Sequence, residues 1–370
     1  MRIAITGLCG FVGSSIARCL LDSLEGVSIV GIDNLVRPGS EMNRGLLGSL
    51  GLRVIHGDIR IQSDLEMLPD SDWVIDAAAN PSVLAGVDGK TTSRQLMEHN
   101  LGGTLNVLEY CRRTGSGFIM LSTSRVYSIQ ALSSMAVASS DTRFVIRPEG
   151  PMLPGASMRG ISEQFSVAPP ISLYGSSKLA SEVVALEYGL TFNFPVWIDR
   201  CGVLAGAGQF GTAEQGIFSY WLHAHAARRP LRYIGFDGRG FQVRDAFHPQ
   251  DLTALVITQM KNGHKRGACI YNVGGGTGNS MSLCELNAWC NDRFGKHTPD
   301  ADTRPRAFDI PWLVMDSNLA DNELGWTPRR SLSSPPAEQR QRLRDSRLES
   351  IGTVLCRWSI LTAISEILKW

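Results

Sequence analysis

The chain has 370 residues, enough for two lobes or for one large α/β domain with insertions. Its 36 basic and 35 acidic side chains leave a formal charge of +1, which argues against nucleic acid and anionic lipid as partners. The 8 cysteines include no C-x-x-C pair, so the sequence predicts neither a metal site nor a disulfide framework. With no signal-peptide pattern and no uninterrupted membrane span, we expect a cytoplasmic protein.

Short β-branched runs alternate with helical patterns through the first half of the chain. The runs are apolar nearly throughout, as is typical of parallel strands covered on both faces, and they comprise residues 2–6, 27–33, 52–56, 72–79, 117–122 and 195–200. Residues 10–21 and 94–113 carry apolar side chains at three- and four-residue spacing, which predicts crossover helices. The alternation predicts an α/β fold with a doubly wound parallel sheet of the Rossmann type.

Beyond about residue 200 the sequence becomes rich in glycine and irregular, which predicts a smaller C-terminal lobe over residues 201–330. We expect this lobe to be interleaved with the sheet domain of residues 1–200, because elements near 240–262 have the pattern of a returning packing helix. Residues 331–370 are predicted to form a polar connector followed by an amphipathic C-terminal helix.

Three glycines follow the first predicted strand and open the first predicted helix. Gly7 permits a tight turn, Gly10 lets the backbone approach a pyrophosphate, and Gly13 lets helix and strand pack closely. Asp33 ends the second strand, where a carboxylate can accept both ribose hydroxyls and repel a 2′-phosphate. The pattern predicts an NAD site, although three glycines can also simply make a turn.

Further cofactor contacts are expected beside these positions and at the carboxyl ends of the following strands. Arg37 is close enough to Asp33 to weaken the preference for NAD over NADP, and Asp58 is placed either to meet the adenine or to form a turn. The predicted cofactor residues of this region and of the following strands are Gly7, Gly10, Phe11, Val12, Gly13, Asp33, Asn34, Arg37, Asp58, Ile59, Ala77, Ala79, Ser122, Tyr174, Lys178 and Arg200.

Tyr174 and Lys178 are one helical turn apart, so both side chains project from one face of a helix. A phenol has an ordinary pKa near 10, so it acts as a base near neutrality only when a cation such as Lys178 stabilises the phenolate. Thr123, at the end of the fifth strand, is placed to hydrogen-bond the reacting hydroxyl and hold it toward Tyr174.

These motifs together resemble the extended short-chain dehydrogenase/reductase family. The resemblance rests on TGLCGFVG, Asp33, STSRVY, YGSSK and VRDAFHPQDL, and it covers residues 1 to about 330. It implies a catalytic trio of Thr123, Tyr174 and Lys178, a buried Asn100 near the cofactor, and a homodimer or homotetramer. Dehydratases of the family carry an Asp-Glu pair after the threonine, where this chain has Ser124 and Arg125, so we expect no dehydration.

The smaller lobe contains candidate substrate ligands. Arg244 offers a planar fork to a diphosphate, although it could instead pair with Asp245 or another acid. The predicted substrate residues are Thr123, Ser124, Gln209, Thr212, Gln215, Gln242, Arg244 and Arg304. Gln209, Thr212 and Gln215 could equally cap their loop, and the sequence does not decide between Arg304 and Arg306.

Within the family, the resemblance is to members that invert carbon 2 of a CDP-hexose. The hypothesis is therefore an NAD-dependent nucleotide-sugar epimerase in which Tyr174 removes the proton of the 2-hydroxyl and a transient 2-keto sugar rotates before reduction. Two alternatives stay open. A UDP-sugar 4-epimerase would use the same trio, and a noncatalytic NAD-binding sensor or scaffold would use only the cofactor site.

Overall fold

The computed structural model describes residues 1–263 and 269–332. Its centre is a seven-stranded sheet in which all neighbours run parallel. The spatial order is β3 (Arg53–His56), β2 (Ser28–Asp33), β1 (Arg2–Thr6), β4 (Trp73–Asp76), β5 (Gly117–Thr123), β10 (Val196–Cys201) and β14 (Ile270–Val273). Six of these strands confirm the sequence prediction. The pattern missed β14, a four-residue strand that contains the polar Asn272.

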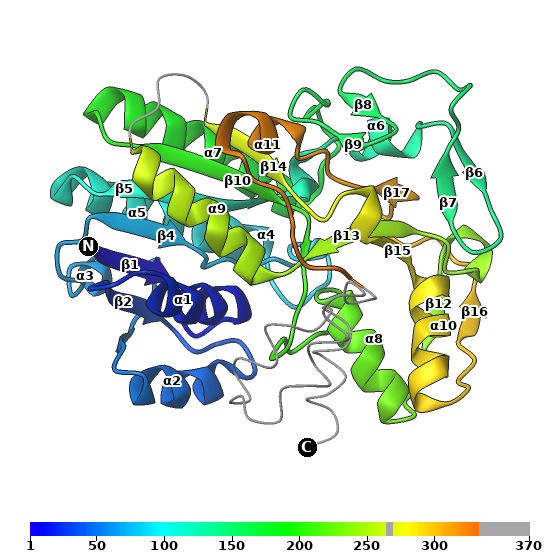
Figure 1. Cartoon of the computed structure of the whole chain (residues 1–370), viewed down its shortest axis with the longest axis horizontal. Coiled ribbons are helices and arrows are strands. Elements are labelled where there is room, and N and C mark those ends of the chain that lie inside the picture. Colours follow the sequence, from blue (N-terminus) through cyan, green and yellow to red (C-terminus); the bar gives the residue numbers. More distant parts are fainter. Residues whose placement is uncertain (264–268, 333–370) are drawn as a thin grey trace.

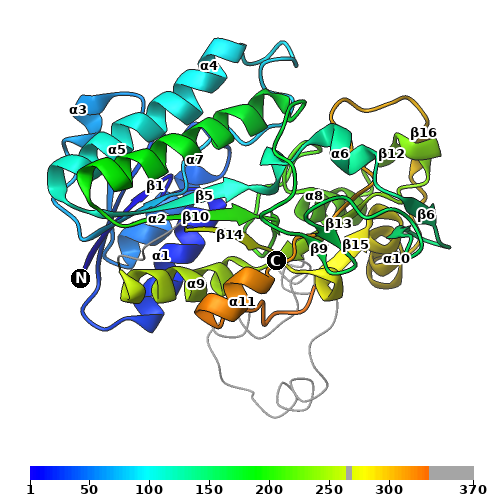
Figure 2. The ribbon, with the colours of Figure 1, turned by 90° about the horizontal axis from the view of Figure 1, so that it is seen from above.

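Helices cover both faces of the sheet, as Figure 2 shows from above. One face packs against α1 (Phe11–Ser23), α2 (Ser40–Ser49), α9 (Pro249–Asn262) and α11 (Asn318–Leu324), and the other against α3 (Gln62–Leu65), α4 (Ser93–Met97), α5 (Gly103–Thr114) and α7 (Ser172–Phe192). A separate apolar core fills the space on each side. The α/β class and the doubly wound arrangement are therefore confirmed.

The single helix predicted over 94–113 is interrupted. It forms as α4, a π-helical turn Glu98–Gly102, and α5. A π-helical turn is wider than an α-helical one and is common at functional sites. Here it places Asn100 in the interior, where the amide contacts Asn80 and Ser177. The local sequence pattern carries no sign of this insertion because the side-chain partners lie on other elements.

A second lobe is built around a small mixed sheet, seen on the right of Figure 1. Its elements are β11 (Val203–Leu204), β13 (Val243–Phe247), β15 (Ser280–Ser282) and β17 (Trp312–Leu313), the pair β12 (Arg232–Ile234) and β16 (Asp300–Asp302), and the helices α8 (Ile217–Ala226) and α10 (Leu283–Phe294). The short hairpins β6 (Val137–Ser139) with β7 (Phe144–Ile146) and β8 (Ala156–Ser157) with β9 (Gly160–Ile161), and helix α6 (Ile129–Ser133), complete it.

The two lobes do not divide at residue 200 as expected, because segments on each side of that position pack into the other lobe. Side chains between 126 and 165 share one apolar cluster with side chains between 241 and 315. Conversely, two elements from the second part of the chain belong to the large-sheet domain: α9 packs on α1, and β14 joins the large sheet. The lobes are thus interleaved more extensively than the predicted return near 240–262.

The predicted connector and C-terminal helix over 331–370 lie outside the described residues, apart from Ser331 and Leu332. The Leu332 side chain is buried in the cluster formed by α8 and α10. Within the described ranges, no helix combines the length and apolar character needed to cross a membrane.

A buried ion pair supports the sheet below the carboxyl end of β5. The guanidinium of Arg200 on β10 donates to both carboxylate oxygens of Glu182 on α7, with a shortest distance of 2.7 Å. Ser122 also donates to Glu182, and Arg200 donates to the Tyr127 hydroxyl at 3.3 Å. The two ionic side chains are only 6% and 1% exposed, so neither can turn to water if its partner is removed.

Replacing Glu182 with alanine should lower the free energy of unfolding by about 3–5 kcal/mol, because the Arg200 charge is left buried and unpaired. The double replacement Glu182→Leu with Arg200→Met should cost less, since it removes both charges together. Urea unfolding of the two variants measures the difference. A loss under about 1 kcal/mol for the single variant would show that the pair is not a structural requirement.

Candidate functional site

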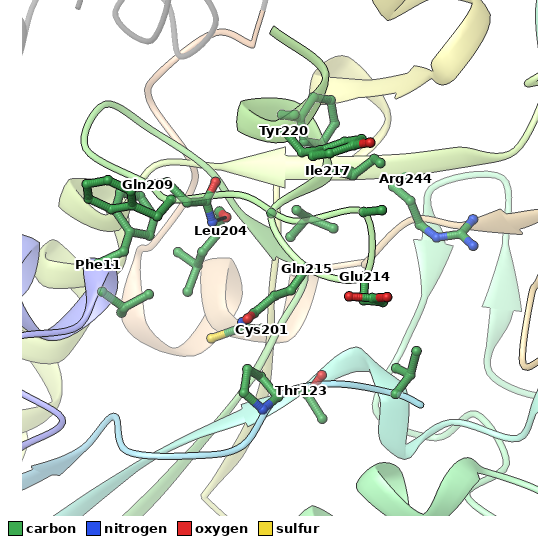
Figure 3. Close-up of a pocket in the computed structure, with 18 of the residues that line it drawn as sticks. Phe11, Thr123, Cys201, Leu204, Gln209, Glu214, Gln215, Ile217, Tyr220 and Arg244 are labelled. Atoms are coloured by element: carbon green, nitrogen blue, oxygen red, sulfur yellow. Dashed lines mark hydrogen bonds between the residues drawn. The ribbon is translucent and has the colours of Figure 1, made fainter. Parts of the chain in front are cut away.

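A cavity of about 680 Å³ lies where the carboxyl ends of the large sheet's strands meet the smaller lobe. Figure 3 shows side chains from both lobes around it, with Thr123 from β5 on one side and Gln215, Tyr220 and Arg244 from the smaller lobe on the other. The predicted site residues that line it are Gly7, Gly10, Phe11, Val12, Gly13, Arg37, Ala77, Ala79, Ser122, Thr123, Ser124, Tyr174, Gln209, Gln215, Gln242 and Arg244.

The glycine-rich turn between β1 and α1 has the shape of a phosphate cradle. Gly7 has a φ of +62°, which favours glycine, and a Cβ atom on Gly13 would lie 2.3 Å from the Gly7 carbonyl oxygen. Side chains at these two positions are therefore excluded, and the backbone of the first turn of α1 stays open to the cavity. This backbone can hold a dinucleotide pyrophosphate at the N-terminus of α1.

Asp33 ends β2 beside this turn and is almost fully buried. One carboxylate oxygen accepts the backbone N–H of Cys9 at 2.8 Å, and the other accepts that of Leu35 at 2.8 Å. The carboxylate itself does not line the cavity, but its two anchors fix it next to residues that do. From the loop after β2, Arg37 reaches into the cavity and hydrogen-bonds Gln215 of the smaller lobe.

The predicted contacts near the end of β3 lie outside the cavity wall. Asp58 accepts hydrogen bonds from Arg60 and, at 3.0 Å, from the Asn34 amide. Burial would raise the pKa of Asp58, but these hydrogen bonds outweigh it and lower the pKa. Ile59 is buried and faces Gly103 on α5. These residues shape the edge of the nucleotide-binding region without facing the main cavity.

The proposed trio comes from two neighbouring elements. Thr123 ends β5, while Tyr174 and Lys178 lie in the first turns of α7. The first turn of α7 is held by Ser172, whose hydroxyl accepts the N–H of Gly175 at 3.1 Å. Tyr174 lines the cavity beside Thr123, whereas the Lys178 side chain is buried behind the wall. The structure thus brings the three residues together.

Burial dominates the electrostatics of the trio. It raises the pKa of the Tyr174 phenol to about 12, against the opposing effects of a hydrogen bond with Thr123 and the charges of Arg125 and Arg37. Burial also lowers the pKa of the Lys178 ammonium, which Asp76 and Glu182 partly restore. Within these surroundings, the phenol is neutral near pH 7 and needs further positive charge to become a base.

Two predicted cofactor residues support the trio from inside the protein. The Asn100 amide accepts the backbone N–H of Asn80 at 2.8 Å and donates to the Ser177 hydroxyl at 3.0 Å, which ties α7 to the segment after β4. Arg200 was predicted to contact the cofactor, but its guanidinium is turned inward to Glu182 and Tyr127 and does not line the cavity. Arg200 therefore forms a structural ion pair with Glu182.

On the substrate side, Arg244 faces the cavity and also pairs with a carboxylate. That partner is Asp309, with an N–O distance of 3.3 Å, and not the neighbouring Asp245, which accepts the backbone N–H of Gly276. The Gln242 amide donates to the same Asp309 at 3.1 Å. The carbonyl oxygens of Val243 and Ile310 also accept from the guanidinium, so both terminal nitrogens of Arg244 are held while the residue still lines the cavity.

The glycine-rich loop of residues 205–216 contributes less than expected. Both polar atoms of the Gln209 amide are used, one by the Ser219 hydroxyl and one by the Leu204 carbonyl. Thr212 closes a tight turn with Gln215 and lies outside the cavity wall. Gln215 lines the cavity and accepts from Arg37. Loop capping therefore accounts for Gln209 and Thr212.

The two arginines considered in the last predicted segment point in different directions. Arg304 is exposed and pairs with Asp302 at 2.7 Å, so it lies outside the cavity, contrary to the prediction. Arg306 lines the cavity and donates to the Ala213 carbonyl at 3.0 Å. The two residues are separated by one position, and only the course of the backbone determines which one turns inward.

Several lining residues were not among the predicted ligands. The ionic ones are Arg125, Arg232, Glu214 and Asp309, and Phe210 adds an aromatic ring over Gly39. The sequence signal that could have identified Phe210 as a lining residue is its position as an aromatic residue between glycines. No sequence signal connects Asp309 to Arg244, because the two residues are 65 positions apart. Arginines outnumber carboxylates in the wall, which suits an anionic ligand.

Comparisons with known proteins agree with this geometry. The model of the NAD dependent epimerase/dehydratase family matches residues 3–274. The CDP-paratose 2-epimerase of Salmonella typhi is 31% identical over 351 residues, covering 90% of this chain and 96% of the relative. The dTDP-glucose 4,6-dehydratase of Streptomyces antibioticus is 26% identical, covering 94% and 93%. The solved UDP-glucuronic acid 4-epimerase of Bacillus cereus, bound to UDP-glucuronic acid and NAD, has a TM-score of 0.71 at 24% identity, covering 90% and 96%.

The chain therefore belongs to the NAD dependent epimerase/dehydratase family. The predictions of an enzyme and of NAD as its cofactor are confirmed at the level of the family. The glycine cradle fits this cofactor, because the turn packs too closely at Gly7 and Gly13 for side chains and its backbone lines the cavity.

Replacing Asp33 with asparagine should weaken NAD binding by about tenfold, because an ionised hydrogen-bond acceptor for the ribose is lost. The same change should narrow the preference for NAD over NADP, since the carboxylate no longer repels a 2′-phosphate. Calorimetric titration of wild type and variant with both dinucleotides measures these effects. If wild type binds NADP as tightly as NAD, the assignment of Asp33 to the ribose is wrong.

Proposed function

We propose that this enzyme is an epimerase that inverts carbon 2 of a CDP-hexose through a transient 2-keto intermediate. One observation carries the choice of reaction. Next to Thr123 the chain places Ser124 and Arg125, and the carboxylates in the cavity wall of the described residues are Glu214 and Asp309, both from the smaller lobe. No carboxyl pair is therefore available beside the reacting threonine for the elimination of water.

The chain's own residues provide what an epimerisation needs. Tyr174, once ionised, takes the proton of the sugar hydroxyl, and Thr123 holds that hydroxyl toward the phenol. Lys178, buried one turn further along α7, favours the phenolate. NAD held by the glycine turn at Gly7, Gly10 and Gly13 would supply a positively charged ring and the capacity to store a hydride while the keto sugar turns its opposite face. Tyr174 then gives its proton back, so no second base is required.

The diphosphate is assigned to the arginines on the opposite wall. Arg244 and Arg306 line the cavity from the smaller lobe, and a guanidinium binds phosphate oxygens through two parallel N–H groups. With the diphosphate at this wall, the sugar extends toward Thr123 and Tyr174. The CDP nucleotide and carbon 2 are supported by the 31% identity with the CDP-paratose 2-epimerase of Salmonella typhi.

A UDP-sugar 4-epimerase is the second candidate. Its support is the UDP-glucose 4-epimerase of Corynebacterium glutamicum, which is 25% identical and covers 90% of this chain. The same trio would serve if the sugar were bound in another orientation, with carbon 4 next to Tyr174. The expectations of a cytoplasmic location and of a homodimer or homotetramer stay predictions.

Incubation with CDP-paratose, CDP-glucose and UDP-glucose should give inversion at carbon 2 of a CDP-sugar and no 4-epimer of UDP-glucose. Nuclear magnetic resonance of the products identifies the changed stereocentre directly. Conversion of UDP-glucose to its 4-epimer would support the second candidate. Protein that carries NAD and converts no member of the panel would favour a sensor or scaffold.

Replacing Tyr174 with phenylalanine should lower kcat by at least 100-fold, because general acid–base catalysis contributes roughly 10²–10⁴-fold. NAD binding should change little, since the ring and its packing are kept. Turnover and cofactor content are measured on the same preparation, with Tyr220→Phe as the control because Tyr220 lines the cavity from α8. Unchanged turnover in the Tyr174 variant contradicts the mechanism.

A further inference from the structure

Arg125 lies directly after the strand that carries Thr123, in the 3-10 turn Ser124–Val126. Its backbone packs against α7 at Gly175, where a Cβ atom would come 2.3 Å from the Arg125 carbonyl oxygen. Gly175 immediately follows Tyr174, so the absence of a side chain at this position lets the turn pack closely beside the phenol. Backbone contact therefore fixes the place of Arg125 relative to Tyr174.

The guanidinium of Arg125 lines the cavity without an ion pair to any described residue. Its Nη1 atom donates to the Phe308 carbonyl oxygen at 3.2 Å. Arg200 and Arg244, by contrast, each pair with a carboxylate. The Asp309 carboxylate and the Arg244 and Arg306 guanidinium groups act on Arg125 without a direct ion pair, and the Tyr174 phenol is among the groups on which Arg125 acts.

The same turn also orients the hydroxyl of Thr123. The backbone N–H of Arg125 donates to Thr123 Oγ1 at 3.2 Å, which occupies one acceptor site of that oxygen. The hydroxyl hydrogen stays available for the phenol oxygen of Tyr174, whose pKa the Thr123 side chain lowers. A donor to this oxygen favours the charged form of the phenol. The turn therefore supplies both a cation and an oriented hydroxyl.

The groups that face the phenol come from separate parts of the fold. They are Thr123 from β5, Arg125 from the 3-10 turn, Cys201 from β10 and Arg37 from the loop after β2. The Cys201 thiol and burial raise the pKa of Tyr174, whereas the cations and the hydroxyl lower it. Burial is the largest of these effects, so the base depends on its cations.

We propose that Arg125 is a positioning residue that stabilises the phenolate of Tyr174 together with Lys178 and thereby sets the pH range in which the enzyme is active. The inference rests on the proposed function, in which Tyr174 takes the proton of the sugar. A carboxylate at position 125 would act in the opposite sense, because a like charge disfavours ionisation of the phenol. The sign of the charge at this position therefore matters more than its shape.

A series of substitutions at position 125 tests the effect of charge. In NAD-loaded protein with carbon-13-labelled tyrosine, R125K should leave the pKa of Tyr174 within a few tenths of a unit, R125M should raise it by about one unit, and R125E should raise it further. The tyrosine signal is assigned by its loss in Y174F. R232M is the matched control, because Arg232 lines the same cavity from β12 and is not among the charges that act on the phenol.

The pH dependence of kcat gives a second readout. Because removing a cation raises the pKa of the base, the rise of kcat with pH should occur at higher pH in R125M than in wild type. At pH values below this rise, kcat of R125M should be about tenfold lower, and at alkaline pH it should return to the wild-type value. A loss of kcat that is equal at all pH values, or a rise in KM with an unchanged tyrosine titration, overturns the proposal. If no sugar nucleotide is converted, the proposed function fails, while the titration of Tyr174 still decides the role of Arg125.

Discussion

The contact between the end of β5 and the start of α7 is the constraint on which the site depends. Gly175 leaves no side chain between α7 and the turn that follows Thr123, so the two backbones meet. Ser172 holds the first turn of the helix from below, and the Asn100 amide fixes the next turn through Ser177. The phenol, the threonine hydroxyl and the lysine are thereby placed without any contribution from a mobile loop.

Placing ionisable groups at this site has an electrostatic cost. The surrounding protein offsets that cost behind the cavity wall more completely than in the cavity. Behind the wall, Glu182 and Arg200 satisfy one another almost completely, so that region is structural. In the cavity, several arginines face one another, and Arg244 alone among those in the wall pairs with a described carboxylate. An excess of positive charge in a cavity wall is stabilised when an anion enters, which links the electrostatics of the site to the kind of ligand it favours.

In the proposed function, the residues beside the trio decide which reaction the chain can perform. Here a serine and an arginine follow Thr123, so the position contributes positive charge and cannot transfer protons as a carboxyl pair does. Oxidation and reduction at one carbon require only one base, and in the proposed function Tyr174 is that base. In the proposed function, the nucleotide and the carbon that reacts depend on how the smaller lobe holds the diphosphate, for which Arg244 and Arg306 line the cavity.

Local patterns in the sequence were sufficient for six strands of the sheet, the glycine cradle, Asp33 and the spacing of Tyr174 and Lys178, because each depends on residues close together in the chain. The direction in which a long side chain points, in contrast, does not depend only on residues close to it in the chain. Arg200 turns to Glu182, 18 positions away, and Arg244 turns to Asp309, 65 positions away. Arg306, not Arg304, enters the cavity. Those outcomes depend on which distant segments the fold brings together, and the energy of pairing a buried charge exists only once they meet.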